Sequence, residues 1–101
     1  MSKYSKELLR SIEYSLKQYE RDYKLMSGSY YGSVKLRILY NILNFKRVLA
    51  DNKDNSKEAH LYYHMQSKIL EMLENEDNND KTYEKRCKIL IKQLELEKDF
   101  V

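Results

Sequence analysis

Apolar residues return along much of this chain at alternating steps of four and three, the spacing that places them on one face of a helix. A first run covers residues 5–26 and contains Leu8, Ile12, Leu16, Tyr19, Tyr23 and Met26. A last run begins at Asp80 or Lys81 and contains Tyr83, Cys87, Leu90, Ile91 and Leu94. We predict an amphipathic helix over each of these runs.

Two further helices are predicted between them. Residues 34–50 are apolar on two sides, with Val34, Ile38, Ile42, Phe45 and Leu49 in one row and Leu36, Leu39, Tyr40 and Leu43 in another. Because such a helix must be covered on both sides, we expect it to be central in the fold or to meet another chain. A third helix, capped by Asn55 or Ser56, has on its apolar side Leu61, Tyr62, Met65, Ile69, Met72 and Leu73.

Polar segments separate the predicted helices, and the chain contains no proline. DNKDNS and NEDNND follow the second and third helices, and both glycines fall between the first and the second. Four helices with short polar connections predict an all-α fold, a small antiparallel helical bundle. The length of 101 residues corresponds to one domain, which we expect to span residues 1–101.

The glycine segment GSYYGSVK, residues 28–35, raises the question of phosphate binding. A G-x-x-x-x-G-K-[ST] loop follows a strand and has four residues between its glycines. Here a helix precedes the segment, and only three residues separate Gly28 from Gly32. We therefore interpret Gly28 as the end of the first helix and Ser33 as the N-cap of the second.

Other residues with potential chemistry are also interpreted as structural. His60 and His64 are one helical turn apart, but no third metal ligand and no H-E-x-x-H motif accompanies them, so we interpret them as surface histidines. Cys87, the only cysteine, falls on the apolar side of the last helix and is predicted to be a core residue. The sequence predicts no enzyme activity, no metal and no cofactor.

Hydropathy and charge bear on location and partners. No stretch is long and apolar enough for a membrane span or a signal peptide, so we expect a cytoplasmic protein that does not bind membranes. Residues 1–50 carry ten Lys or Arg and four Asp or Glu, whereas the rest of the chain carries nine and twelve. The two halves therefore differ in the sign of their charge.

Three groups of residues are candidates for contact with a larger protein. They are two adjacent loop tyrosines, an acidic segment, and apolar residues opposite the main apolar side of the last helix. The predicted partner-binding residues are Tyr30, Tyr31, Glu74, Glu76, Asp77, Ile89, Leu96 and Phe100. The apolar group also makes a homodimer a possible assembly.

A basic flank on the first helix supports an alternative interpretation. It consists of Lys6, Arg10, Tyr14, Lys17, Arg21 and Lys24. Such a flank could follow a phosphate backbone while the aromatic ring stacks on a base. Glu13 and Glu20 lie on the same helix, however, and mixed charge is typical of an ordinary solvated face.

We therefore predict a non-enzymatic protein-binding regulator or inhibitor that acts by surface contact. The composition, rich in Lys, Asn and Tyr, is typical of proteins from AT-rich bacteria, phages or mobile elements, where small binders often disable host proteins. The acidic segment suggests a nucleic-acid-handling host protein as the target, because its charge complements a basic groove. The alternative is a small nucleic-acid-binding protein that uses the basic flank.

Overall fold

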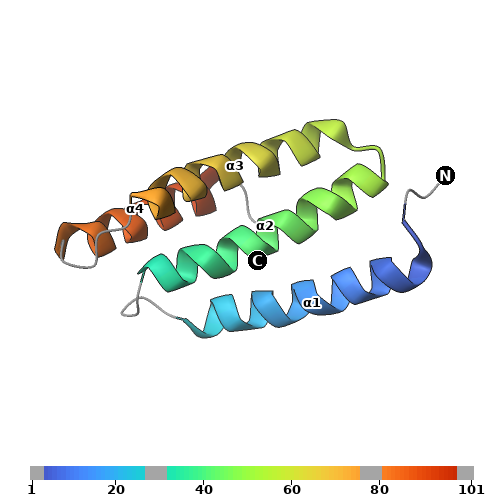
Figure 1. Cartoon of the computed structure of the whole chain (residues 1–101), viewed down its shortest axis with the longest axis horizontal. Helices are drawn as coiled ribbons and strands as arrows, with labels where there is room; N and C mark the ends of the chain where they lie inside the picture. Colours follow the sequence, from blue (N-terminus) through green and yellow to red (C-terminus); the bar gives the residue numbers. More distant parts are fainter. Residues whose placement is uncertain (1–3, 27–31, 76–80, 98–101) are drawn as a thin grey trace.

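The computed structural model describes residues 4–26, 32–75 and 81–97. They form four helices, α1 (Lys6–Leu25), α2 (Gly32–Asn52), α3 (Ser56–Glu74) and α4 (Lys81–Glu97). Within these ranges there is no strand, and successive helices run in opposite directions (Figure 1). The predicted all-α bundle of four helices is confirmed.

Side-chain caps fix the starts of two helices. The Ser5 side chain accepts a hydrogen bond from the Leu8 N–H at 3.1 Å, and the Asn55 side chain accepts one from the Glu58 N–H at 3.2 Å. Both caps satisfy an N–H group that has no partner inside its own helix. Of the two predicted caps for α3, Asn55 is therefore the correct one.

The predicted start of α2 is wrong. This helix begins at Gly32, so Ser33 is its second residue and not its N-cap. The Gly32 N–H and the Ser33 hydroxyl instead donate hydrogen bonds to the two carboxylate oxygens of Glu84 on α4, the second at 3.0 Å. A carboxylate from another helix thus takes the place of a local cap, which the local sequence does not show. Gly28 lies outside the described residues.

The α2 helix is central, as one of the two interpretations of its apolar circumference predicted. It packs against α1, α3 and α4. Four of its side chains are completely inaccessible to solvent: Leu36, Leu39, Ile42 and Leu43. These four come from both predicted rows, whereas Val34, from the same row as Ile42, lies at the surface.

The remaining core comes largely from α3 and α4. The five predicted core residues of α4 are all buried, Cys87 among them. On α3 the buried apolar side chains are Tyr62, Met65 and Ile69, and within the described residues of α1 Tyr23 alone is buried. None of the helices described here combines the length and the apolar character that a membrane span requires.

The α4 helix covers one end of the bundle (Figure 1). Its residues contact the last turn of α1 through Tyr23, the first turn of α2 through Glu84, and the end of α3 through Met72. We call this region, residues 19–26, 32–43, 67–75 and 81–97, the four-helix end. The opposite region, residues 6–18, 44–52 and 56–66, is called the three-helix end.

Candidate binding surfaces

The outward side of α4 carries exposed apolar side chains. Ile89 is 56% exposed and Leu96 is 88% exposed, as predicted from their positions opposite the buried side of the helix. Exposed Lys85 and Lys92 share this side, because steps of four and three residues separate the four positions. We call Lys85, Ile89, Lys92 and Leu96 the α4 strip. Phe100, predicted to belong to this group, lies outside the described residues.

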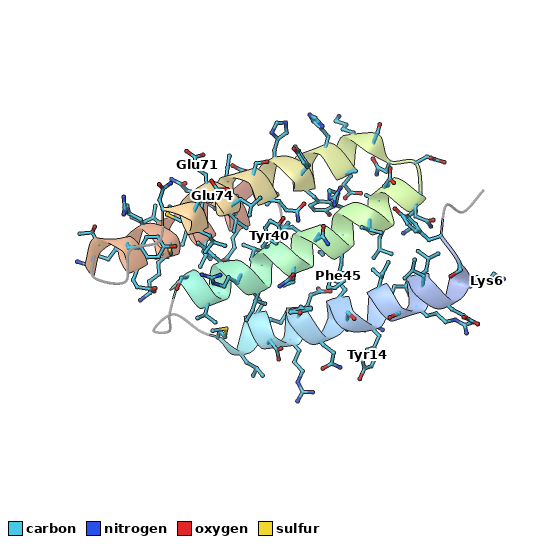
Figure 2. All side chains as sticks on the ribbon, in the orientation of Figure 1. Lys6, Tyr14, Tyr40, Phe45, Glu71 and Glu74 are labelled. Atoms are coloured by element: carbon cyan, nitrogen blue, oxygen red, sulfur yellow. The ribbon has the colours of Figure 1, made fainter. Side chains whose placement is uncertain are left out.

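The acidic candidates are described only in part. Glu74 is exposed at the end of α3, and Glu71 lies one turn before it, also exposed (Figure 2). Glu76 and Asp77 lie outside the described residues, as do the loop residues Tyr30 and Tyr31.

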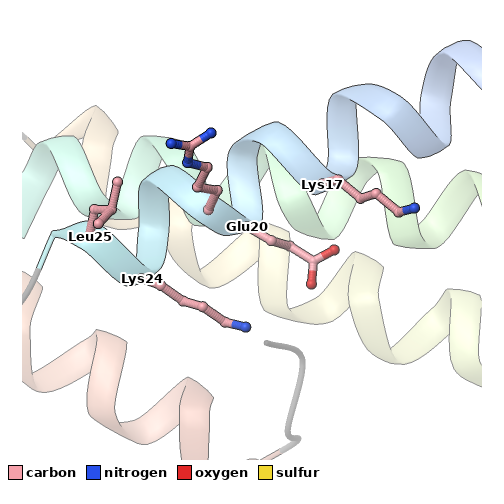
Figure 3. A pocket seen from close by; sticks show the side chains of 5 residues that line it. Lys17, Glu20, Lys24 and Leu25 are labelled. Atoms are coloured by element: carbon pink, nitrogen blue, oxygen red, sulfur yellow. The ribbon is translucent and has the colours of Figure 1, made fainter.

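The basic flank of α1 lies at the surface over its whole length. Its six residues are all exposed, and Tyr14, at 68%, points away from the bundle (Figure 2). Towards the end of α1 the side chains of Lys17, Glu20, Arg21, Lys24 and Leu25 line a hollow of about 490 Å³ (Figure 3). The Glu20 side chain lies between Lys17 and Lys24 (Figure 3). Its carboxylate interrupts the positive charge of the basic flank at this hollow.

A second hollow, not predicted from the sequence, lies between α1, α2 and α4 at the four-helix end. Its volume is about 200 Å³, and its lining includes Lys35, Lys88, Lys92 and Glu95. Three ammonium groups and one carboxylate give this lining a net positive charge. Lys88 and Lys92 are one turn apart on α4, a spacing visible in the sequence, but the contribution of Lys35 depends on how α2 packs against α4.

A buried phenol lies beside this second hollow. The Tyr23 hydroxyl donates a hydrogen bond of 2.9 Å to a Glu95 carboxylate oxygen, and the Lys35 ammonium lies 4.5 Å from the centre of the Tyr23 ring. Burial raises the pKa of Tyr23 far above its ordinary value, and the hydrogen bond and negative charge of Glu95 raise it further. Tyr23 therefore remains a neutral hydrogen-bond donor that joins α1 to α4.

In the part of the chain that the structure describes, no group of three or more His, Cys, Asp and Glu residues is placed to hold one metal ion. His60 and His64 are both exposed on α3, as predicted, and their rings contact each other.

Comparisons with known proteins place this chain in no group, because no family model, no curated protein and no solved structure matches it.

Proposed function

We propose that this protein is a non-enzymatic binding protein, a regulator or inhibitor that acts by covering a surface of a larger protein. The observation that carries the proposal is the exposure of Ile89 and Leu96 on the outward side of α4. The opposite side of the same helix supplies five buried residues to the core. Packing within the bundle therefore explains that side of α4 and does not require apolar residues at positions 89 and 96.

The α4 strip indicates the chemistry of the partner. Leu96 and Ile89 provide apolar area that a partner can remove from water, which stabilises a complex by roughly 25 cal/mol per Å² buried before the costs of association. Lys85 and Lys92 lie on the same side and favour acidic residues around the apolar contact, because opposite charges guide association. The expected partner surface is therefore an apolar patch with acidic residues at its edge.

A nucleic-acid-handling protein of the host is the proposed class of target. The exposed carboxylates of Glu71 and Glu74 extend from the end of α3 (Figure 2) and complement a basic groove of the kind that binds phosphate backbones. One partner could satisfy both surfaces if its acidic patch met the α4 strip and its basic groove met the end of α3.

Photo-crosslinking tests the α4 strip directly. Gln93 is exposed and lies one turn from both Ile89 and Leu96, so Gln93→benzoylphenylalanine places a photoreactive group beside the strip. We expect a covalent adduct with a larger protein after irradiation of cells. Leu96→Asp and Ile89→Asp should each weaken capture of that protein about 30-fold, the effect of losing about 2 kcal/mol at a hot spot.

A matched control is available on α3. Leu70 is 42% exposed, so Leu70→Asp introduces the same charge at another exposed apolar position. It should leave capture unchanged, and circular dichroism should show equal helicity in all variants. If adducts form only between two copies of the chain, the partner of the α4 strip is a second copy of this protein and not a larger protein. Equal capture by the control and the two strip variants would contradict the proposal.

A second candidate function, nucleic-acid binding, is favoured by the exposure of all six residues of the basic flank. If the flank follows a phosphate backbone, binding should fall steeply as salt rises, because each neutralised phosphate releases counterions. Lys17→Glu combined with Arg21→Glu should then abolish binding. Lys53→Glu combined with Lys57→Glu, a change of equal charge at exposed positions elsewhere, should weaken it less. Similar losses for both pairs would contradict a specific role of the flank.

A further inference from the structure

Two imidazole rings meet on the outer side of α3. His60 and His64 are four residues apart and both exposed, and their Nε2 atoms are 3.0 Å apart. The ring planes are perpendicular, and the ring centres are 4.5 Å apart. In the metal-free protein one ring can donate a hydrogen bond to the other, but the same arrangement also suits a shared metal ion.

The two distances can be compared with the geometry around a shared ion and with that of a collinear hydrogen bond. An ion about 2.05 Å from both Nε2 atoms makes an N–metal–N angle of about 94° at the observed separation, and it places the ring centres about 4.7 Å apart when it lies in both ring planes. A collinear N–H···N hydrogen bond of the same length would place the ring centres about 5.3 Å apart. The observed 4.5 Å fits a bent hydrogen bond in the metal-free protein, and it is also close to the separation around a metal, so little ring movement is needed to bind an ion.

We propose that His60 and His64 form a two-histidine site for a divalent transition metal, with Cu²⁺ preferred and Ni²⁺ next. An angle near 94° suits the right angles of square-planar and octahedral ions, whereas a tetrahedral ion requires Nε2 atoms about 3.3 Å apart. Among divalent first-row metals, Cu²⁺ also binds most tightly to a given set of nitrogen ligands. Both rings bind as the tautomer that carries its proton on Nδ1, so that each Nε2 lone pair faces the ion.

The helix holds the two ligands in place before the metal arrives. Both rings project from consecutive turns of α3, whose inward side is fixed by the buried Met65 and Tyr62. The part of the chain that the structure describes offers no third ligand at this place, so water occupies the other coordination positions. The site therefore binds an exchangeable ion and leaves open positions for a further ligand, and it does not depend on the proposed protein-binding function.

The test titrates CuCl₂, NiCl₂ and ZnCl₂ separately into the full chain and follows heat release at pH 7.5. We expect one Cu²⁺ per chain and the affinity order Cu²⁺, Ni²⁺, Zn²⁺. His60→Ala and His64→Ala should each weaken Cu²⁺ binding at least about tenfold, or about 1.4 kcal/mol. The electron paramagnetic resonance spectrum of the bound Cu²⁺ should show splitting from two imidazole nitrogens, reduced to one in each single variant.

A compensating variant distinguishes metal binding by a histidine pair from non-specific metal binding elsewhere on the protein. Lys68 is exposed on α3 and lies four residues after His64, so Lys68→His in the His60→Ala background restores a pair one turn further along. This variant should recover the tenfold loss, while the double variant His60→Ala with His64→Ala gives the background. Circular dichroism should show all variants folded. Equal binding by the wild type and the double variant, or half an ion per chain, would overturn the proposed single-chain site.

Discussion

The two ends of this bundle share α1, α2 and α3 but differ in α4, which belongs to the four-helix end alone among the described residues. At the four-helix end Leu36, Leu39 and Leu43 of α2 are completely buried, in a core that includes Cys87 and Leu94 of α4. At the three-helix end the apolar residues of α1 are only half-buried, and Leu8 is 46% exposed. An amphipathic helix therefore buries its apolar side only as far as neighbouring helices extend.

Polar contacts show the same difference. Near the three-helix end the Gln66 side-chain amide donates two long hydrogen bonds of 3.4 Å, to the Tyr40 carbonyl and to the Asn44 side chain. Asn44 also accepts from Arg47 at 2.9 Å, while Arg47 Nε is buried without a hydrogen-bond partner among the described residues. At the four-helix end, in contrast, the carboxylates of Glu95 and Glu84 accept shorter hydrogen bonds, of 2.9 Å from Tyr23 and 3.0 Å from Ser33. Stability should therefore be concentrated where α4 packs.

The largest contrast is expected from leucine truncation. Leu39→Ala at the four-helix end should destabilise the protein by about 2–5 kcal/mol, because it leaves a cavity in a site with no exposure to solvent. Leu9→Ala at the three-helix end should cost less than about 1.5 kcal/mol, since Leu9 is only half-buried and water replaces part of its contacts. Urea unfolding followed by circular dichroism measures both, and equal losses would remove the contrast.

A smaller loss is expected when the contact between α4 and the start of α2 is removed. Glu84→Ala leaves the Gly32 N–H and the Ser33 hydroxyl without their acceptor, and both residues are buried, so we expect a loss of about 1–3 kcal/mol. Glu84→Gln keeps one acceptor oxygen and should recover part of it. Urea midpoints that are the same for Glu84→Ala and the wild type would show that α2 starts without this carboxylate.

Gly32→Ala tests the same contact by overpacking. A Cβ atom at this position would lie 2.8 Å from the Cys87 Cβ and 3.1 Å from the Glu84 carbonyl oxygen, so α4 would have to move away from α2. Overpacking of this kind typically costs about 1–3 kcal/mol. Val34→Ala, at an exposed position two residues further on, is the control and should change the urea midpoint little.

The fold could be predicted from the sequence because each helix carries its own periodic signal. The spacing of Tyr83, Cys87 and Leu94 on α4 identified buried residues, and the apolar circumference of α2 indicated a central helix. The start of α2 could not be predicted, because Glu84 is 52 residues away from Gly32 in the sequence. Local cap rules favoured Ser33, whose hydroxyl forms a hydrogen bond with α4 instead.

The candidate sites were predictable to different extents. Exposure of Ile89 and Leu96 follows from their position on a helix whose other side is buried, so periodicity alone identified them. The hollow beside Tyr23 depends on three helices, and its Lys35 is far from Lys88 and Lys92 in the sequence. The spacing of His60 and His64 placed them on one side of a helix, but only side-chain conformation brings their Nε2 atoms to 3.0 Å.

Ionisation of the Tyr23 phenol should lower the stability of the protein at high pH. Tyr23→Phe removes the hydrogen bond to Glu95 and should cost about 1 kcal/mol at pH 8. Because the folded protein raises the pKa of Tyr23, the wild type keeps this contribution below about pH 10, where an unfolded tyrosine is neutral. Above that pH the unfolded state ionises first, and stability falls by up to about 1.4 kcal/mol per pH unit.

The pH dependence can be isolated by comparing two unfolding curves. The Tyr23→Phe variant lacks this one ionisation, whereas the other tyrosines contribute equally to both proteins. The difference in unfolding free energy between wild type and variant should therefore shrink between pH 10 and pH 11 and then change sign. A constant difference over this range would show that Tyr23 ionises as readily in the folded protein as in the unfolded chain.

The smallest effect is expected at the surface of the four-helix end. The Lys68 ammonium lies 2.7 Å from a Glu97 carboxylate oxygen and joins α3 to the end of α4. Both side chains remain partly exposed, so water screens the attraction and ordering two long side chains offsets much of it. Lys68→Ala should therefore change the unfolding free energy by less than about 0.5 kcal/mol, and by less still in 1 M salt. A loss above 1 kcal/mol at low salt would mean that α4 is held by its outer charges as well as by its apolar side. A loss as small as expected would indicate that the buried side of α4 and the Glu84 contact, and not its surface charges, stabilise the four-helix end.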